Sequence, residues 1–146
     1  MKKSNLKRLG ALPQVCEPIG EIDDHLESLS GAEGDPTHLY HSGLKVLQSV
    51  LERVGAGLSP LNDELCMIAH RVMAGPVSRL ESVLGLLAGS MGREHASSLH
   101  MARALSQSTL SDDSKAEVMI MHHLGLMAIA SEDPLRASFL FENAAE

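Results

Sequence analysis

The segment from Val118 to Glu146 carries the pattern that most restricts how this chain can fold. Its first half has apolar residues at helical spacing, at Met121, Leu124, Met127 and Ala128. Asp133 followed by Pro134 is a typical helix start, because aspartate caps a first turn and proline fits its first position. The residues from Ser131 to Asp133 then form a turn. The segment therefore predicts a helical hairpin.

Small residues stand where the two helices of this hairpin must touch. Gly125 and Ala128 offer shallow surfaces on the first helix. The second helix places Ala137, Phe141 and Ala144 on one face, because residues three, four and seven apart share a helix face. We therefore expect the two helices to pack closely.

Aromatic residues are too scarce for a typical β-sheet core. The 146 residues include no Trp, one Tyr and two Phe, whereas 44% are hydrophobic and eight are Met. Sheets are normally rich in aromatic and β-branched residues, whereas Leu, Ala and Met favour helices. The sequence therefore predicts an all-α fold, with a flexible leader at 1–18 and a single helical domain at 19–146.

Charge and hydropathy exclude several classes of function. The formal net charge is −7 at pH 7, which argues against a nucleic-acid surface because phosphate binding needs clustered Lys and Arg. The basic residues near the N-terminus are not followed by the apolar run of a signal peptide. No apolar run is long enough to cross a membrane. We therefore expect a cytoplasmic protein with reduced thiols at Cys16 and Cys66 and no membrane partner.

An acidic stretch follows the leader. Carboxylates with no Lys or Arg among them occupy the region 17–35, at Glu17, Glu21, Asp23, Asp24, Glu27, Glu33 and Asp35. Apolar residues recur at helical spacing within it, at Ile19, Ile22, Leu26 and Leu29. The pattern predicts a short amphipathic helix that ends near Gly31. It is either a solvated helix or an arm that imitates a partner and folds onto the chain's own groove.

Proline and glycine divide the middle of the chain into further helices. The first is expected to start at Pro36 and to end at Gly55 and Gly57, with an apolar stripe at Tyr40, Leu44, Leu47, Leu51 and Val54. The second is expected to run from Pro60 to Gly75, with a stripe at Leu61, Leu65, Ile68, Ala69 and Val72. These two helices are expected to form a hairpin.

A third proline start, at Pro76, opens the next expected helix. It reaches a turn at 89–92, after which a helix through Leu99 and Leu105 leads to a loop at 106–111. Ser111 is expected to cap the C-terminal hairpin, with Asp112 and Asp113 near the helix N-terminus.

The C-terminal hairpin resembles the tetratricopeptide repeat, a helix-turn-helix unit. Leu124 and Gly125 match the family's Leu-Gly pair, and Ala137, Phe141 and Ala144 match its small and aromatic positions. A second copy begins at Leu84-Gly85, with Ala88, Gly92, Ser97, Met101 and Ala104 at the same relative positions as Ala128, Glu132, Ala137, Phe141 and Ala144. The resemblance implies about three stacked hairpins with an extra N-terminal helix, that is, a short TPR-like solenoid.

The resemblance also implies a function and a site. Small repeat proteins of this kind resemble bacterial secretion chaperones and adaptors, which are not enzymes, so we expect a partner peptide or amphipathic helix to bind in a helical groove. The positions that would face the inner curve and contact the partner are Arg79, Ser82, Leu86, Met119, His122, Leu126 and Ile129. A closed bundle, in which the small residues serve packing alone, would have no such groove.

The histidines offer an alternative function. The chain contains eight histidines. His38 and His41 share a helix face, and a second pair, His95 and His100, flanks one helical turn. No carboxylate stands at the spacing of a known metal motif, so we expect no metal and no cofactor, and the alternative is a small helical bundle that binds a metal or ligand through histidines. No catalytic signature of a Ser, Cys or phosphate-binding type occurs, so no catalytic residue is predicted.

Self-association is a further expectation. The last helix has no polar capping helix after it in the sequence, and repeat stacks normally need one. Its apolar edge, at Phe139 or Leu140, is therefore expected to be exposed and to support a homo-oligomer through the C-terminal helix.

Overall fold

The computed structural model describes residues 12–29, 34–111, 114–130 and 134–145. Within these ranges the fold is all-helical and contains no strand, as the composition predicted. Residues 12–16 are helical and lead through a 3-10 turn, Glu17–Ile19, into α2, Gly20–Leu29. Leu12, Val15 and Cys16 pack against the core, so ordered structure begins before the predicted boundary at residue 18. Residues 1–11 of the expected leader lie outside the described part.

Helix α3, Pro36–Leu58, starts where the sequence predicted and ends later. Asp35 caps it by accepting a hydrogen bond from the Thr37 backbone N–H at 3.1 Å. The expected end at Gly55 and Gly57 is wrong, since the helix continues through both glycines. A helical glycine costs only about 1 kcal/mol relative to alanine, which the burial of Val54 and Leu58 outweighs. The predicted stripe is wrong at Leu51, which is exposed.

Helix α4, Asp63–Ser90, replaces two of the expected helices. Asn62 caps it by accepting from the Leu65 N–H at 2.9 Å, and the helix then continues through Gly75 and Pro76. Pro76 removes one backbone hydrogen bond and costs about 3 kcal/mol in a helix interior. The buried residues on both sides of it offset this cost, and they are Met73, Ala74, Val77, Leu80 and Leu84. The expected helix end at Gly75 and new start at Pro76 are therefore wrong, whereas α3 and α4 do pack against each other.

Glycine 92 ends the turn between α4 and α5, Glu94–Ser108. Its φ of 78° is in the left-handed region, which glycine adopts at little cost. The Arg93 N–H donates to the Ala88 carbonyl at 2.9 Å and the Gly92 N–H donates to the Gly89 carbonyl at 3.1 Å. These two bonds form a Schellman motif, which satisfies the last carbonyls of α4. The predicted turn at 89–92 thus lies at the end of α4.

Helices α6, Ser114–Ala130, and α7, Pro134–Ala145, form the predicted C-terminal hairpin. A Cβ atom built on Gly125 would lie 2.6 Å from Cε1 of Phe141, so the two helices approach as closely as the small residue allows. The α4–α5 hairpin repeats this contact, because Gly85 faces Met101, the same number of positions further along. The turn at 131–133, Asp112 and Asp113, and the side chain of Ala137 lie outside the described residues.

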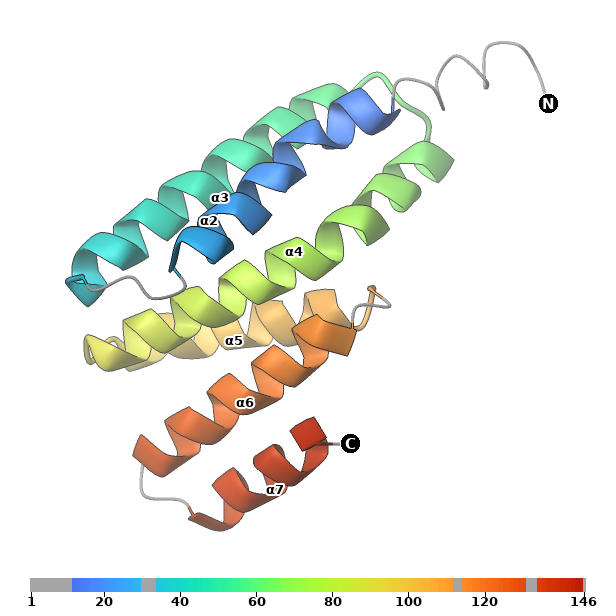
Figure 1. Cartoon of the computed structure of the whole chain (residues 1–146). Helices are drawn as coiled ribbons and strands as arrows, with labels where there is room; N and C mark the ends of the chain where they lie inside the picture. Colours follow the sequence, from blue (N-terminus) through green and yellow to red (C-terminus); the bar gives the residue numbers. More distant parts are fainter. Residues whose placement is uncertain (1–11, 30–33, 112–113, 131–133, 146) are drawn as a thin grey trace.

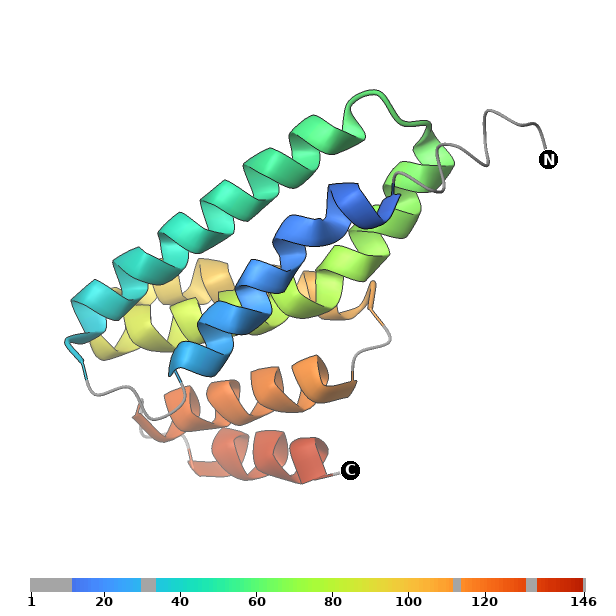
Figure 2. The same cartoon turned by 45° about the horizontal axis from the view of Figure 1, so that its top comes forward.

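The helices follow one another across the molecule. Helix α4 is central, since it contacts α2, α3, α5 and α6, while α7 packs on α6 at the far edge (Figures 1 and 2). The main core lies between α2, α3 and α4, and its fully buried members include Ile22, Val50, Val54, Leu80 and Leu84. A smaller cluster of Ala128 and Leu140 joins α6 to α7.

The close contact at Gly125 predicts opposite effects for two glycine substitutions. Gly125→Leu is expected to lower the free energy of unfolding by about 1–3 kcal/mol, because the new side chain overlaps the ring of Phe141. Gly55→Ala meets nothing within 4 Å and is expected to raise it by about 0.4–1 kcal/mol. Urea denaturation followed by circular dichroism measures both. Equal effects of the two substitutions would contradict this packing.

Candidate partner-binding surface

Helix α6 is apolar on nearly all sides, yet only part of it is covered. Its residues Ala116, Ile120 and Ala128 are buried. The side away from them carries Lys115, Val118, Met119, His122, Leu126 and Ile129, which helical spacing places on one face. We call this set the α6 face. Val118, Leu126 and Ile129 are 47%, 38% and 54% exposed, although a helix that is apolar all round is normally buried.

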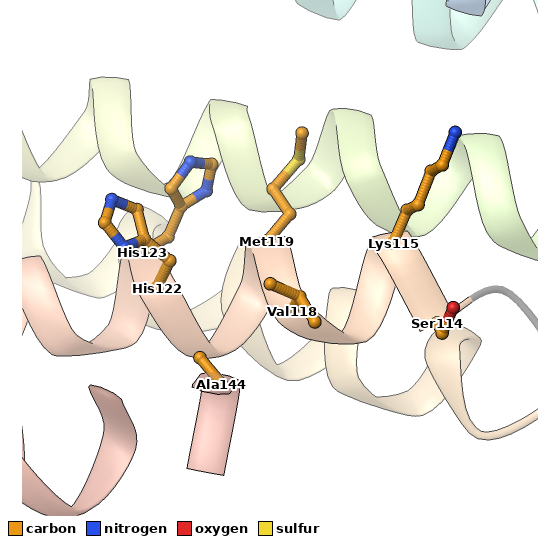
Figure 3. A pocket seen from close by; sticks show the side chains of 7 residues that line it. All are labelled: Ser114, Lys115, Val118, Met119, His122, His123 and Ala144. Atoms are coloured by element: carbon orange, nitrogen blue, oxygen red, sulfur yellow. The ribbon is translucent and has the colours of Figure 1, made fainter. Parts of the chain in front are cut away.

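A shallow hollow lies along the first half of the α6 face. It has a volume of about 520 Å³ and is lined by Ser114, Lys115, Val118, Met119, His122, His123 and, from α7, Ala144. Figure 3 shows Lys115 and Met119 projecting from α6 on the side of α4. His122 also lies beside the ring of Phe141, with ring centroids 5.5 Å apart. The hollow therefore combines an apolar lining with donor groups of Lys and His.

His123 joins this face to α4. Its Nδ1 lies 3.1 Å from the hydroxyl of Ser82, which is fully buried and donates to the Arg79 carbonyl. Burial and the neighbouring His122 lower the pKa of His123 below its ordinary value, and the contact with Ser82 opposes this only in part. His123 is therefore a neutral group of the α4–α6 interface near pH 7.

Arg79 joins α4 to α2. Its guanidinium lies 2.9 Å from a carboxylate oxygen of Asp23. Arg79 and Ser82 are separated by less than one helical turn, so α2 and α6 flank the same side of α4. Glu21 of α2 pairs in the same way with Arg53 of α3. The acidic helix is thus packed between α3 and α4, with Ile22 fully buried, and is part of the core.

The predicted partner-binding residues fall on two adjacent helices. Met119, His122, Leu126 and Ile129 lie on the α6 face, and Leu86 is half-buried on α4. Arg79 is bonded to α2, and buried Ser82 supports His123 rather than reaching the surface. Sequence reasoning missed Lys115, Val118 and His123. Lys115 and Val118 stand four residues before Met119 and His122, so the same helical spacing extended toward the N-terminus would have found them.

A buried polar network lies elsewhere in the molecule and was also missed. The Tyr40 hydroxyl is 2.9 Å from Nε2 of His100, and Nδ1 of His100 is 2.6 Å from a carboxylate oxygen of Glu81. In the neutral histidine, the Tyr40 O–H donates to Nε2 while the Nδ1–H donates to Glu81. The network links α3, α4 and α5, and the Arg93 guanidinium covers the Tyr40 ring at 5.9 Å. All three members are buried, so they hold the helices together rather than meet a substrate.

Within the described residues, the histidines are not grouped with other metal-binding side chains. In the described ranges, no group of three or more His, Cys, Asp and Glu side chains is placed to hold a metal ion. His38, His41 and His95 are exposed, whereas His100 is buried in the network. Cys16 and Cys66 are free, half-buried thiols.

Over its described residues, the protein is thus all-helical and leaves an apolar face of α6 exposed. No family model, no curated protein and no solved structure matches the chain. Among the helices that the structure describes, none has both the length and the apolar composition to span a membrane.

Acid pH is expected to weaken the α4–α6 interface. The pKa of His123 and that of His25 are both lowered by burial, so below the ordinary value of about 6.5 the unfolded chain takes up protons first. The free energy of unfolding is therefore largest above about pH 6.5, the ordinary pKa of histidine. It falls as the pH drops toward the lowered pKa values of the two histidines in the folded protein. Urea denaturation between pH 7.5 and 5 measures the slope. His123→Gln should flatten it, and an unchanged slope would contradict the role of His123.

Proposed function

We propose that this protein is a non-enzymatic interaction module that binds an amphipathic helix or a peptide of another protein on the α6 face. In this proposal the α4–α5 and α6–α7 hairpins stack as in a tetratricopeptide solenoid, after α2 and α3. The equivalent Gly85–Met101 and Gly125–Phe141 contacts support the stack. A role as a cytoplasmic chaperone or adaptor, of the kind found in bacterial secretion, is the specific form of this proposal.

One observation carries the proposal, and it is the exposure of apolar side chains on α6. Val118, Leu126 and Ile129 leave apolar surface in water on a helix whose other sides are covered by α4, α5 and α7. Burying such surface stabilises by roughly 25 cal/mol per Å². Contiguous exposed apolar surface marks interaction sites in folded proteins. Binding of an amphipathic helix would cover it in the helix-in-groove mode.

Site-specific crosslinking tests the proposal. A photoreactive amino acid at Leu126 or Ile129 is expected to give discrete covalent adducts with another protein in cells that produce this chain. The control is Leu99 on α5, which is also apolar and 44% exposed but lies off the α6 face. Adducts at Leu99 of equal yield, or no adducts at either α6 position, would count against a dedicated binding face.

Self-association is the competing use of the apolar surface. The sequence predicted that Phe139 or Leu140 would be exposed. Phe139 on α7 is 64% exposed, whereas Leu140 is buried. Light scattering after size-exclusion chromatography measures the oligomeric state of the unmodified chain and of Phe139→Ser. The comparison distinguishes self-association from binding of another protein. A dimer that becomes a monomer on this substitution would assign the surface near α7 to a second copy.

A further inference from the structure

We infer that the partner of the α6 face is an amphipathic helix with one basic edge, which lies against α2. This inference rests on the proposed function and specifies the chemistry of the partner. The evidence comes from the edge of α2 that faces α4. Asp23 marks that edge, because its carboxylate reaches Arg79 of α4. Glu27 lies one turn further along the same edge, since residues four apart share a helix face.

Within the described residues, the acidic edge has more negative charge than the neighbouring cations neutralise. Arg79 already pairs with Asp23, and the Asp23 carboxylate remains about half exposed, at 51%. The side chain of Glu27 is exposed and forms no ion pair or hydrogen bond in the described part of the chain. The α2 sequence contains four carboxylates and no Lys or Arg. A partner that supplies a cation there gains attraction without displacing an existing ion pair.

The acidic edge and α6 meet α4 within one helical turn. Arg79 of α4 bonds to Asp23 of α2, and Ser82, three residues on, contacts His123 of α6. In this inference a ligand seated on the α6 face therefore also reaches α2. A helix with its side chains is about 10–12 Å across. A bound helix would therefore take up the width of one more helix beside those of this protein. Its apolar stripe would cover Leu126 and Ile129, and its flank toward α2 would carry Lys or Arg.

The overall charge favours this occupant over the alternatives. With a net charge of −7, the chain attracts a basic partner at long range and repels both nucleic acid and a second copy of itself. Complementary charge also orients the bound helix, because only one of its two flanks would face α2. The α6 face thus provides the apolar area that binding buries, and α2 determines the orientation of the bound helix.

A displayed peptide library tests the inference with the full-length protein. The probes are helical peptides with a fixed apolar stripe and with Lys or Glu encoded equally at both flanks. Selection is expected to enrich Lys along one flank only. Asp23→Asn combined with Glu27→Lys should reduce that enrichment about fivefold, since an exposed charge pair has an effect of this order. Glu52→Gln combined with Glu94→Lys adds the same net charge on exposed positions of α3 and α5 and should leave it unchanged.

The outcomes separate the inference from the proposed function. Selected peptides without a Lys preference, or an equal loss in the control variant, would overturn the basic edge and leave helix binding intact. Failure to select any peptide above background, with the protein folded by circular dichroism, would reject helix binding on the α6 face itself. Selection that survives Ile129→Asp would place the binding site elsewhere.

Discussion

Glu81→Leu is expected to lower the free energy of unfolding by about 2–4 kcal/mol, the largest stability effect of any single substitution considered for this chain. The carboxylate of Glu81 is the partner of His100 Nδ1 at 2.6 Å, and both side chains are buried. Its removal leaves a buried N–H without an acceptor, which costs more than the hydrogen bond contributes. Urea denaturation measures the change.

Matched variants separate the network from simple packing. Glu81→Gln retains an acceptor oxygen and should cost less than Glu81→Leu, and Tyr40→Phe should cost about 1 kcal/mol because it removes one hydroxyl. Replacing all three members together, as Tyr40→Phe, Glu81→Leu and His100→Leu, should recover part of the loss, since no buried polar group is left unsatisfied. A triple variant as unstable as the sum of the single changes would show that shape, not polarity, dominates the site.

Leu126→Asp combined with Ile129→Asp is expected to weaken binding of the partner recovered by crosslinking at least about 100-fold. Both side chains are exposed in the free protein, so the stability of the fold should change little. In the complex, each carboxylate would lose water against an apolar surface, and central apolar contacts contribute about 2 kcal/mol or more each. Titration of the partner against each variant measures the affinity.

The control for this pair lies on α5. Leu99→Asp combined with Leu105→Asp makes the same change in charge at apolar positions that are 44% and 37% exposed. This variant should bind the partner with unchanged affinity. If it binds as weakly as the α6 variant, the loss reflects the added negative charge and the α6 face is not the binding surface.

The starts of α3 and α7 and the C-terminal hairpin could be predicted because they depend on neighbours in the chain. Asp35 caps α3 through the amide two residues on, and Gly125 lies against Phe141, sixteen residues further along the chain. These contacts are local or nearly so, and residue type alone restricts them. Four residues of the α6 face, Met119, His122, Leu126 and Ile129, were predicted from the resemblance to the tetratricopeptide repeat, and helical spacing places them on one face.

Helix ends and the polar network could not be predicted in this way. Gly55 and Pro76 are normal helix breakers, and both lie inside long helices here. Whether a breaker ends a helix depends on the apolar area that the continuing helix buries against others, and no local pattern contains that quantity. The contact of Tyr40 with His100 joins residues sixty positions apart, so nothing in either neighbourhood indicates it.

The amino-acid sequence by itself determined that this protein is helical, because its few aromatic residues and its periodic Leu, Ala and Met cannot build a sheet core. It also determined where α3 and α7 begin. Only the tertiary structure decided that α4 continues past Pro76, that Glu81 meets His100, and that one side of α6 is left uncovered. The physical reason is that these outcomes depend on which surfaces the packed helices remove from water, and that is a property of the whole fold.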